Sequence, residues 1–201
     1  MKISAVTIER EYGSGGTEVA HLLAERTGIP CYGREILEEV SKIRNTSVDE
    51  IEKYEEGVTN SFLYSLYVMA KASAGNANML TEEGHIFVDE QAVIQRFAKN
   101  GPAVFLGHCA SEALKEQKDV LHVFIRCGSY AQKRQRILEE YGIPESKAEN
   151  VRKRFNKKRA NYYYANTSRK WDDYTNYDVI LDSAVLGTDG CAAALAALFS
   201  V

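Results

Sequence analysis

The sequence predicts an α/β fold with three layers, in which helices cover both faces of a roughly five-stranded parallel sheet. Short apolar runs rich in β-branched residues alternate with stretches of helical periodicity, and this alternation is typical of parallel sheets. The first run, residues 2–8, has the apolar character of a strand buried on both faces. A length of 201 residues accommodates one such domain.

The beginning of the chain predicts a strand, a helix, a short strand and a second helix in turn. Residues 17–27 place apolar side chains on one helical face, and Gly28 is a typical signal for the end of that helix. Residues 29–32 have an extended pattern, and a second helix is expected over residues 34–43. These elements supply the first two strands and the helices that follow them.

Residues 45–100 form a long helical stretch in the prediction. Ser47 and Glu50 make a capping box, because a glutamate stands three residues after a serine at a helix start. Apolar residues follow helical spacing in the middle of the stretch, at Phe62, Leu66, Met69 and Ala70. Alternation then returns, with strands expected over 103–106, 120–126 and 177–182, and helices over about 129–141, 145–166 and 189–199.

Composition excludes several classes of protein. A net charge of −3 gives no reason to expect a nucleic-acid or membrane partner, and the longest apolar stretch, residues 62–70, is too short to cross a bilayer. The N-terminal residues have no signal-peptide pattern. The four cysteines include no CxxC pair, so neither a disulfide framework nor a zinc site is indicated. We therefore expect a cytoplasmic protein.

The most specific local motif is a glycine-rich loop between the first strand and the first helix. It consists of Gly13, Ser14, Gly15, Gly16 and Thr17. Three glycines in four positions let backbone N–H groups converge at a helix N-terminus, an arrangement that binds phosphate. The alternative is a plain tight turn between a strand and a helix.

This loop matches the P-loop pattern G-x-x-x-x-G-K-[ST] incompletely. With Gly15 and Thr17 aligned, Gly16 stands at the lysine, whose ammonium normally neutralises charge between the β- and γ-phosphates. Thr17 stands where a hydroxyl would hold Mg²⁺. We expect the charge absent at residue 16 to come from elsewhere, first from Arg10 just before the glycines.

Positive charge is concentrated over residues 147–159. This segment has seven basic residues and one acidic residue, a local charge of +6 on a chain whose net charge is −3. Such a segment indicates either a local anionic ligand or a basic helix that faces solvent. Arg152, Lys158 and Arg159 are the candidates for stabilising the charge that spreads over a transferred phosphoryl group.

Several sequence blocks together resemble the cytidylate kinase-like family. The blocks are residues 8–16, 29–36, 106–110 and 157–163, with Trp171 followed by residues 176–178. The resemblance implies a three-layer P-loop NTPase fold of the nucleoside-monophosphate-kinase type, in which a loop without the lysine is usual. The single domain 1–201 then divides into a core of residues 1–44, 101–144 and 173–201, a helical acceptor-binding insertion at about 45–100 and a basic lid at about 145–172.

The resemblance also implies an acceptor site. It places Arg34, after the second strand, and His108 near the bound acceptor. The chain departs from its relatives here, because they usually have aspartate where Gly33 stands, arginine at His108 and often a basic residue at Thr17. These differences leave the identity of the acceptor open.

The function that these features predict is phosphoryl transfer. We expect an enzyme that uses Mg²⁺ and ATP to move the γ-phosphate to a small phosphorylated acceptor, with a nucleoside monophosphate such as CMP as the leading example. One alternative is a kinase of a different small metabolite. Another is a regulatory protein that binds nucleotide without turnover. The expected partners are ATP and the acceptor, with no nucleic acid and no membrane.

Overall fold

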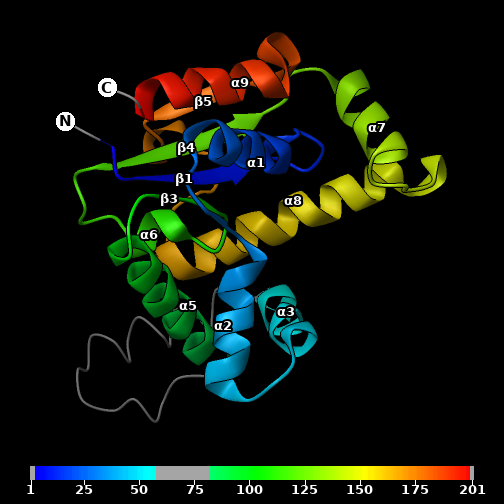
Figure 1. Cartoon of the computed structure of the whole chain (residues 1–201). Helices are drawn as coiled ribbons and strands as arrows, with labels where there is room; N and C mark the ends of the chain where they lie inside the picture. The colour runs from blue at the N-terminus through cyan, green and yellow to red at the C-terminus, as the bar shows by residue number, and fades with distance from the viewer. Residues whose placement is uncertain (1–2, 58–81, 200–201) are drawn as a thin grey trace.

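Five parallel strands form the sheet of the computed structural model, which describes residues 3–57 and 82–199 (Figure 1). The strand order is β2-β3-β1-β4-β5, and every pairing between neighbours is parallel. The predicted parallel sheet is thereby confirmed. The strands are β1 (Ala5–Arg10), β2 (Cys31–Tyr32), β3 (Ala103–Leu106), β4 (Val120–Arg126) and β5 (Val179–Asp182).

Strand β1 occupies the centre of the sheet. Side chains alternate between the two faces of a strand, so Val6 and Ile8 enter one apolar core and Ala5 enters the other. The strand extends two residues beyond its predicted end, because Glu9 and Arg10 continue the pairing with β4. This extension brings two charged residues to the carboxyl edge of the sheet, the edge where open α/β sheets bind ligands.

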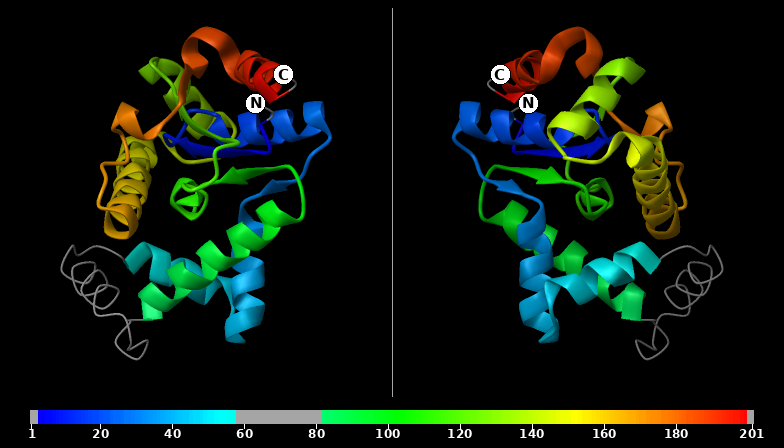
Figure 2. Two further views of the ribbon diagram at one scale, coloured as in Figure 1. Left: turned by 90° about the vertical axis from the view of Figure 1, so that its left-hand side faces the viewer. Right: turned by 90° about the vertical axis from the view of Figure 1, so that its right-hand side faces the viewer.

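Helices α1 (Gly16–Thr27) and α9 (Ser183–Phe199) cover one face of the sheet (Figure 2). Their apolar side chains pack together with those of β1, β3 and β4. Helix α9 begins earlier than predicted, because the Asp182 carboxylate accepts a hydrogen bond from the Ala184 backbone N–H at 2.9 Å and caps the helix. The helix is interrupted at Gly187, where φ is +69°.

The opposite face carries the helices that follow β2 and those around β3. They are α2 (Arg34–Arg44), α3 (Val48–Gly57), α5 (Glu82–Lys99) and α6 (Ala110–Ala113). The predicted capping box is confirmed at α3, where the Glu50 backbone N–H donates to Ser47 Oγ at 3.2 Å. The helical pattern predicted at Phe62, Leu66, Met69 and Ala70 lies outside the described residues.

Helices α7 (Tyr130–Glu139) and α8 (Glu145–Thr167) follow β4, and a short 3₁₀ turn, η2 (Tyr174–Asn176), precedes β5. Tyr163 near the end of α8 is buried with Phe124 of β4 and Trp171. This packing sets which face of α8 points toward the carboxyl edge of the sheet. Among the helices in the described ranges, none is long and apolar enough to cross a membrane.

Candidate active site

The glycine-rich loop joins β1 to α1 in an alternating backbone conformation. Gly13 and Gly15 have positive φ values of +80° and +76°, whereas Ser14 between them does not. Gly15 is the N-cap of α1, so the loop leads directly into the positive end of the helix dipole. Alternation of this kind turns successive N–H groups toward a common side and forms a nest for anions. The backbone alternation is that of an anion nest, in which the Ser14 N–H donates to the Glu11 carbonyl oxygen and the Gly16 N–H to Ser14 Oγ, both at 3.2 Å.

The loop is held by contacts with two distant helices, α9 and α7. Ser183 Oγ donates to the Ser14 carbonyl oxygen at 2.7 Å, and Arg136 Nη1 of α7 donates to the Gly13 carbonyl oxygen at 3.0 Å. A β-carbon added at Gly15 would lie 3.1 Å from Cζ of Arg136 and would also collide with Thr188. Arg136 thus places a positive charge against the loop. Its position in sequence, 121 residues after Gly15, gave no local signal of this contact.

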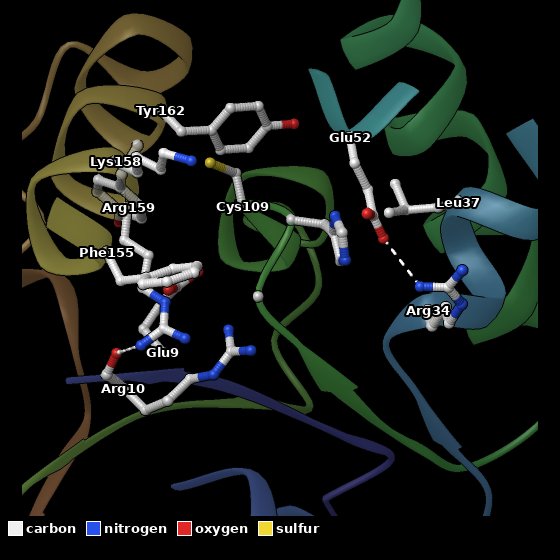
Figure 3. Close-up of a pocket in the computed structure, with 13 residues that line it drawn as sticks. Glu9, Arg10, Arg34, Leu37, Glu52, Cys109, Phe155, Lys158, Arg159 and Tyr162 are labelled. Carbon is white, nitrogen blue, oxygen red and sulfur yellow. Dashed lines mark hydrogen bonds and ion pairs between the residues drawn. The ribbon is translucent and has the colours of Figure 1, made fainter. Parts of the chain in front are cut away.

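A cavity of about 390 Å³ lies at the carboxyl edge of the sheet (Figure 3). Residues 13–17 are not among its described lining residues, and Arg10, whose Cβ and Cγ lie close to Gly16, connects it to the loop. Its wall combines the ends of β1 and β3 with side chains from α2, α3 and α8. The charged and polar lining residues that carry the argument are Glu9, Arg10, Arg34, Glu52, His108, Lys158 and Arg159. Four of these are arginine or lysine and two are carboxylates, so the cavity suits an anion.

Two arginines lie next to one another in this cavity. Arg159 Nη1 of α8 donates to the backbone carbonyl oxygen of Arg10 at 2.9 Å (Figure 3). The Arg159 guanidinium also lies over the ring of Tyr12. Burial, and secondly the charge of Arg10, lower the pKa of the Arg159 guanidinium to about 9. Two neighbouring cations repel one another, and although the Glu9 carboxylate raises the pKa of Arg159, that pKa stays below its ordinary value, so part of the cost remains. An anion bound here would relieve that cost.

Arg34 lies in the opposite wall, and a buried carboxylate outside the described lining, Glu90, lies near His108. Arg34 Nη1 pairs with Glu52 Oε1 at 2.9 Å, joining α2 to α3 on one side of the cavity (Figure 3). Glu90 of α5 is fully buried, accepts a hydrogen bond from the Tyr162 hydroxyl and lies 3.9 Å from Nδ1 of His108. Sequence analysis did not identify Glu90, because a glutamate on a helix gives no sign of being buried.

His108 stands in an unusual backbone conformation. Gly107, His108 and Cys109 have φ values of +79°, +54° and +50°. Non-glycine residues in the left-handed region cost of order 1–2 kcal/mol each, and such residues cluster where a site must be shaped. The turn directly after β3 thus holds the His108 side chain in the wall of the cavity.

The structure brings five of the candidate residues into one cavity, and leaves Arg152 and the loop residues 13–17 outside its described lining. Arg10, Arg34, His108, Lys158 and Arg159 all line the cavity. Arg152 is not among the described lining residues: its guanidinium bonds to the Glu149 carboxylate at 2.8 and 2.9 Å and lies over the ring of Tyr130. Arg152 and Arg159 share α8, and the packing of that helix decides which of them faces the cavity.

The chemistry of the loop also fits Mg²⁺. This ion usually binds through one or two protein oxygens together with substrate phosphates and water. Thr17 is the second residue of α1 and is exposed, so its hydroxyl is an oxygen donor directly after the loop. When bound with a nucleotide, the ion would neutralise phosphate charge and hold the phosphates in register.

A glycine-rich loop after β1 and a cation-lined cavity at the carboxyl edge of a β2-β3-β1-β4-β5 sheet define the fold class of the protein, the P-loop NTPase fold. Solved structures share this fold. Shikimate kinase from Bacteroides thetaiotaomicron matches with a TM-score of 0.54 at 15% identity, covering 98% of both chains. Shikimate kinase from Acinetobacter baumannii, in complex with shikimate, matches with a TM-score of 0.50 at 12% identity, covering 98% of this chain and 93% of that one.

Within this class, the chain belongs to the cytidylate kinase-like family, whose model matches residues 5–185. An uncharacterized protein from Eubacterium ventriosum ATCC 27560 is similar over 99% of both chains, with a TM-score of 0.72 and 24% identity. No curated protein shows a significant match to the sequence. The family that the sequence blocks predicted is confirmed.

Proposed function

We propose that the protein uses Mg²⁺ and ATP to phosphorylate a small phosphorylated acceptor, with a nucleoside monophosphate such as CMP as the first compound to test. The observation that carries this proposal is the cavity at the carboxyl edge of the sheet, where Arg10, Arg34, Lys158 and Arg159 outnumber Glu9 and Glu52. Membership of a kinase-like family and the P-loop kinase fold support it.

In this proposal the loop and the cavity have separate roles. The amide nest at Gly13–Thr17 holds the phosphates of ATP, with Mg²⁺ at the Thr17 hydroxyl, and the cavity holds the acceptor. Arg10 belongs to both, because its stem contacts Gly16 and its guanidinium lines the cavity. Phosphoryl transfer to a phosphate oxygen needs positioning and charge neutralisation more than it needs a base.

Two features support an acceptor that carries its own negative charge. First, the described lining residues of the cavity include four arginine or lysine side chains and two carboxylates. Second, burial and the charge of Arg10 lower the pKa of Arg159. The four cysteines are free thiols, as is usual in a reducing compartment, and we place the reaction in the cytoplasm.

The test is a transfer assay with Mg²⁺ and γ-labelled ATP against nucleoside monophosphates and a panel of phosphorylated metabolites. Label should move to one acceptor class, and the Arg159→Ala protein, purified identically, should lose that transfer, which excludes a contaminating kinase. Turnover only on another metabolite would select the alternative acceptor. Tight ATP binding without transfer to any compound would overturn the proposal in favour of a regulatory nucleotide-binding protein.

A further inference from the structure

The side chain of Arg10 lies between two glycines. A β-carbon added at Gly16 would collide with Cβ of Arg10 and stand 2.9 Å from its Cγ. A β-carbon added at Gly107 would stand 2.6 Å from Nη1 of the same side chain. The aliphatic stem of Arg10 therefore passes over Gly16, and its guanidinium rests against Gly107.

This arrangement bears on the lysine that the loop does not have. Residue 16 stands at the P-loop lysine, yet any side chain at that position would begin in space occupied by Arg10. We propose that Arg10 performs the role of the P-loop lysine, and that Gly16 and Gly107 are positioning residues that make room for it. The positive charge would then come from the end of β1, whereas the P-loop lysine supplies it from the first turn of α1. This inference rests on the proposed phosphate-binding role of the loop.

The location of Arg10 explains how it could replace the P-loop lysine. Arg10 is the last residue of β1, paired with Ile125 of β4, and its carbonyl oxygen accepts the hydrogen bond from Arg159. Its backbone is therefore held from two sides. Its Cβ and Cγ lie close to Gly16 of the loop, and its guanidinium lies against Gly107, which lines the cavity with Arg10. From this position the proposed cation acts on both the donor and the acceptor phosphates.

A stability cycle tests the steric half of the proposal without any substrate. Gly16→Ala should lower the Tm by several degrees in the wild-type background, because the collision involves Cβ of Arg10 and cannot be relieved by rotating a side chain. In an Arg10→Gly background, Gly16→Ala should lower the Tm by clearly fewer degrees. Glycine is used at residue 10 because alanine keeps the colliding atom. Equal losses of Tm in the two backgrounds would overturn the proposal.

A binding cycle tests the electrostatic half. Calorimetric ATP affinity should fall about tenfold or more in Arg10→Gly, the scale of one lost hydrogen bond to a charged group. Arg10→Gly/Gly16→Lys should recover most of that loss, since the collision with Arg10 is then removed and the next neighbour, Cβ of Ile125, stands 3.2 Å from the new β-carbon. The matched control is Arg10→Gly/Gly16→Ala, which adds the β-carbon without the charge and should not recover. Equal ATP affinity in the lysine and alanine double variants would overturn the proposal that Arg10 replaces the lysine.

Gly107 gives a third arm. Gly107→Ala should displace the Arg10 guanidinium and weaken ATP binding, and the same substitution should add little in an Arg10→Ala protein. Full additivity of the two losses would show that Gly107 acts independently of Arg10. All three arms read stability or nucleotide binding, so a wrong acceptor, or absence of turnover, leaves their outcome unaffected. ATP that does not bind the wild-type protein would instead refute the proposed function.

Discussion

Arg159 donates a hydrogen bond from its guanidinium to the backbone carbonyl oxygen of Arg10 at 2.9 Å. The bond holds two cationic side chains side by side in the wall of one cavity. Arg159 comes from α8, in the predicted lid, and Arg10 from the central strand of the core. The pair therefore connects the segment expected to cover the phosphates with the loop expected to bind them.

The first prediction concerns these two arginines. Arg10→Ala and Arg159→Ala should each lower kcat/KM by ~10²-fold or more, the size expected for one lost charged contact to the transition state. The loss in Arg159→Ala should lie mainly in kcat, if α8 closes fully only around the reacting complex. Lys153→Ala is the control, since Lys153 is exposed on the same helix and pairs with Glu149. Near-wild-type kinetics in both arginine variants would contradict the catalytic assignment.

The second prediction follows from the lowered pKa of Arg159. Its folded-state pKa, about 9, lies below its ordinary value, so the free folded protein loses this proton at a pH where the unfolded chain keeps it. Stability without ligand should therefore rise as pH passes upward through about 9. Affinity for ATP or inorganic phosphate should fall over the same range, because the cation that attracts the anion disappears.

Calorimetric titrations between about pH 7.5 and 10 would measure this dependence. An Arg159→Gln protein, which has no charge to lose at this position, should give a flatter profile than the wild type. Identical profiles would assign the pH dependence to other groups in the cavity.

The third prediction concerns Mg²⁺ at Thr17. Thr17→Ala should lower Mg²⁺-dependent turnover by about tenfold or more while leaving Mg²⁺-free nucleotide binding nearly unchanged. Thr17→Ser keeps the hydroxyl and should retain most of the activity. Removal of Mg²⁺ by chelation should erase the difference between wild type and Thr17→Ala. Small, equal effects on turnover and binding would reassign Thr17 to the stability of the helix start.

The fourth prediction separates acceptor binding from nucleotide binding. Arg34→Ala and His108→Ala should each raise the acceptor KM by about tenfold, the range for one hydrogen bond to a charged group, with little change in the KM for ATP. Lys42→Ala is the control, because Lys42 lies on α2 with Arg34 but is exposed and pairs with Glu39. A rise in the KM for ATP instead would move these residues to the donor site.

The fifth prediction tests Arg136, which lies against the glycine loop. Arg136→Ala should weaken ATP binding by about tenfold or more and leave the acceptor KM unchanged. Arg134→Ala provides the comparison, since Arg134 is on the same helix and pairs with Glu145 at the surface. Equal ATP affinities for the two variants would limit Arg136 to a structural role.

Much of the fold was predictable because its signals are local. The apolar pattern of β1, the glycines at residues 13–16 and the capping box at Ser47 each depend on neighbours a few residues away. Local sterics and hydrogen bonding act on such neighbours in any context. The parallel sheet and the loop at its carboxyl edge followed from them. Strand ends were predicted less well, because pairing with β4 carried β1 on to Arg10.

The sequence by itself determined that this chain has a glycine-rich loop between its first strand and first helix, with no lysine at residue 16, and a basic segment at residues 147–159. Only the tertiary structure decided which basic residues serve the loop. It turned Arg159 into the cavity and Arg152 away from it, because Tyr163 and Trp171 anchor α8 against Phe124. The tertiary structure also places Arg136 against Gly13, and places the side chain of Arg10 between Gly16 and Gly107. These contacts join residues far apart in the chain, and their geometry depends on how whole elements pack rather than on local preference.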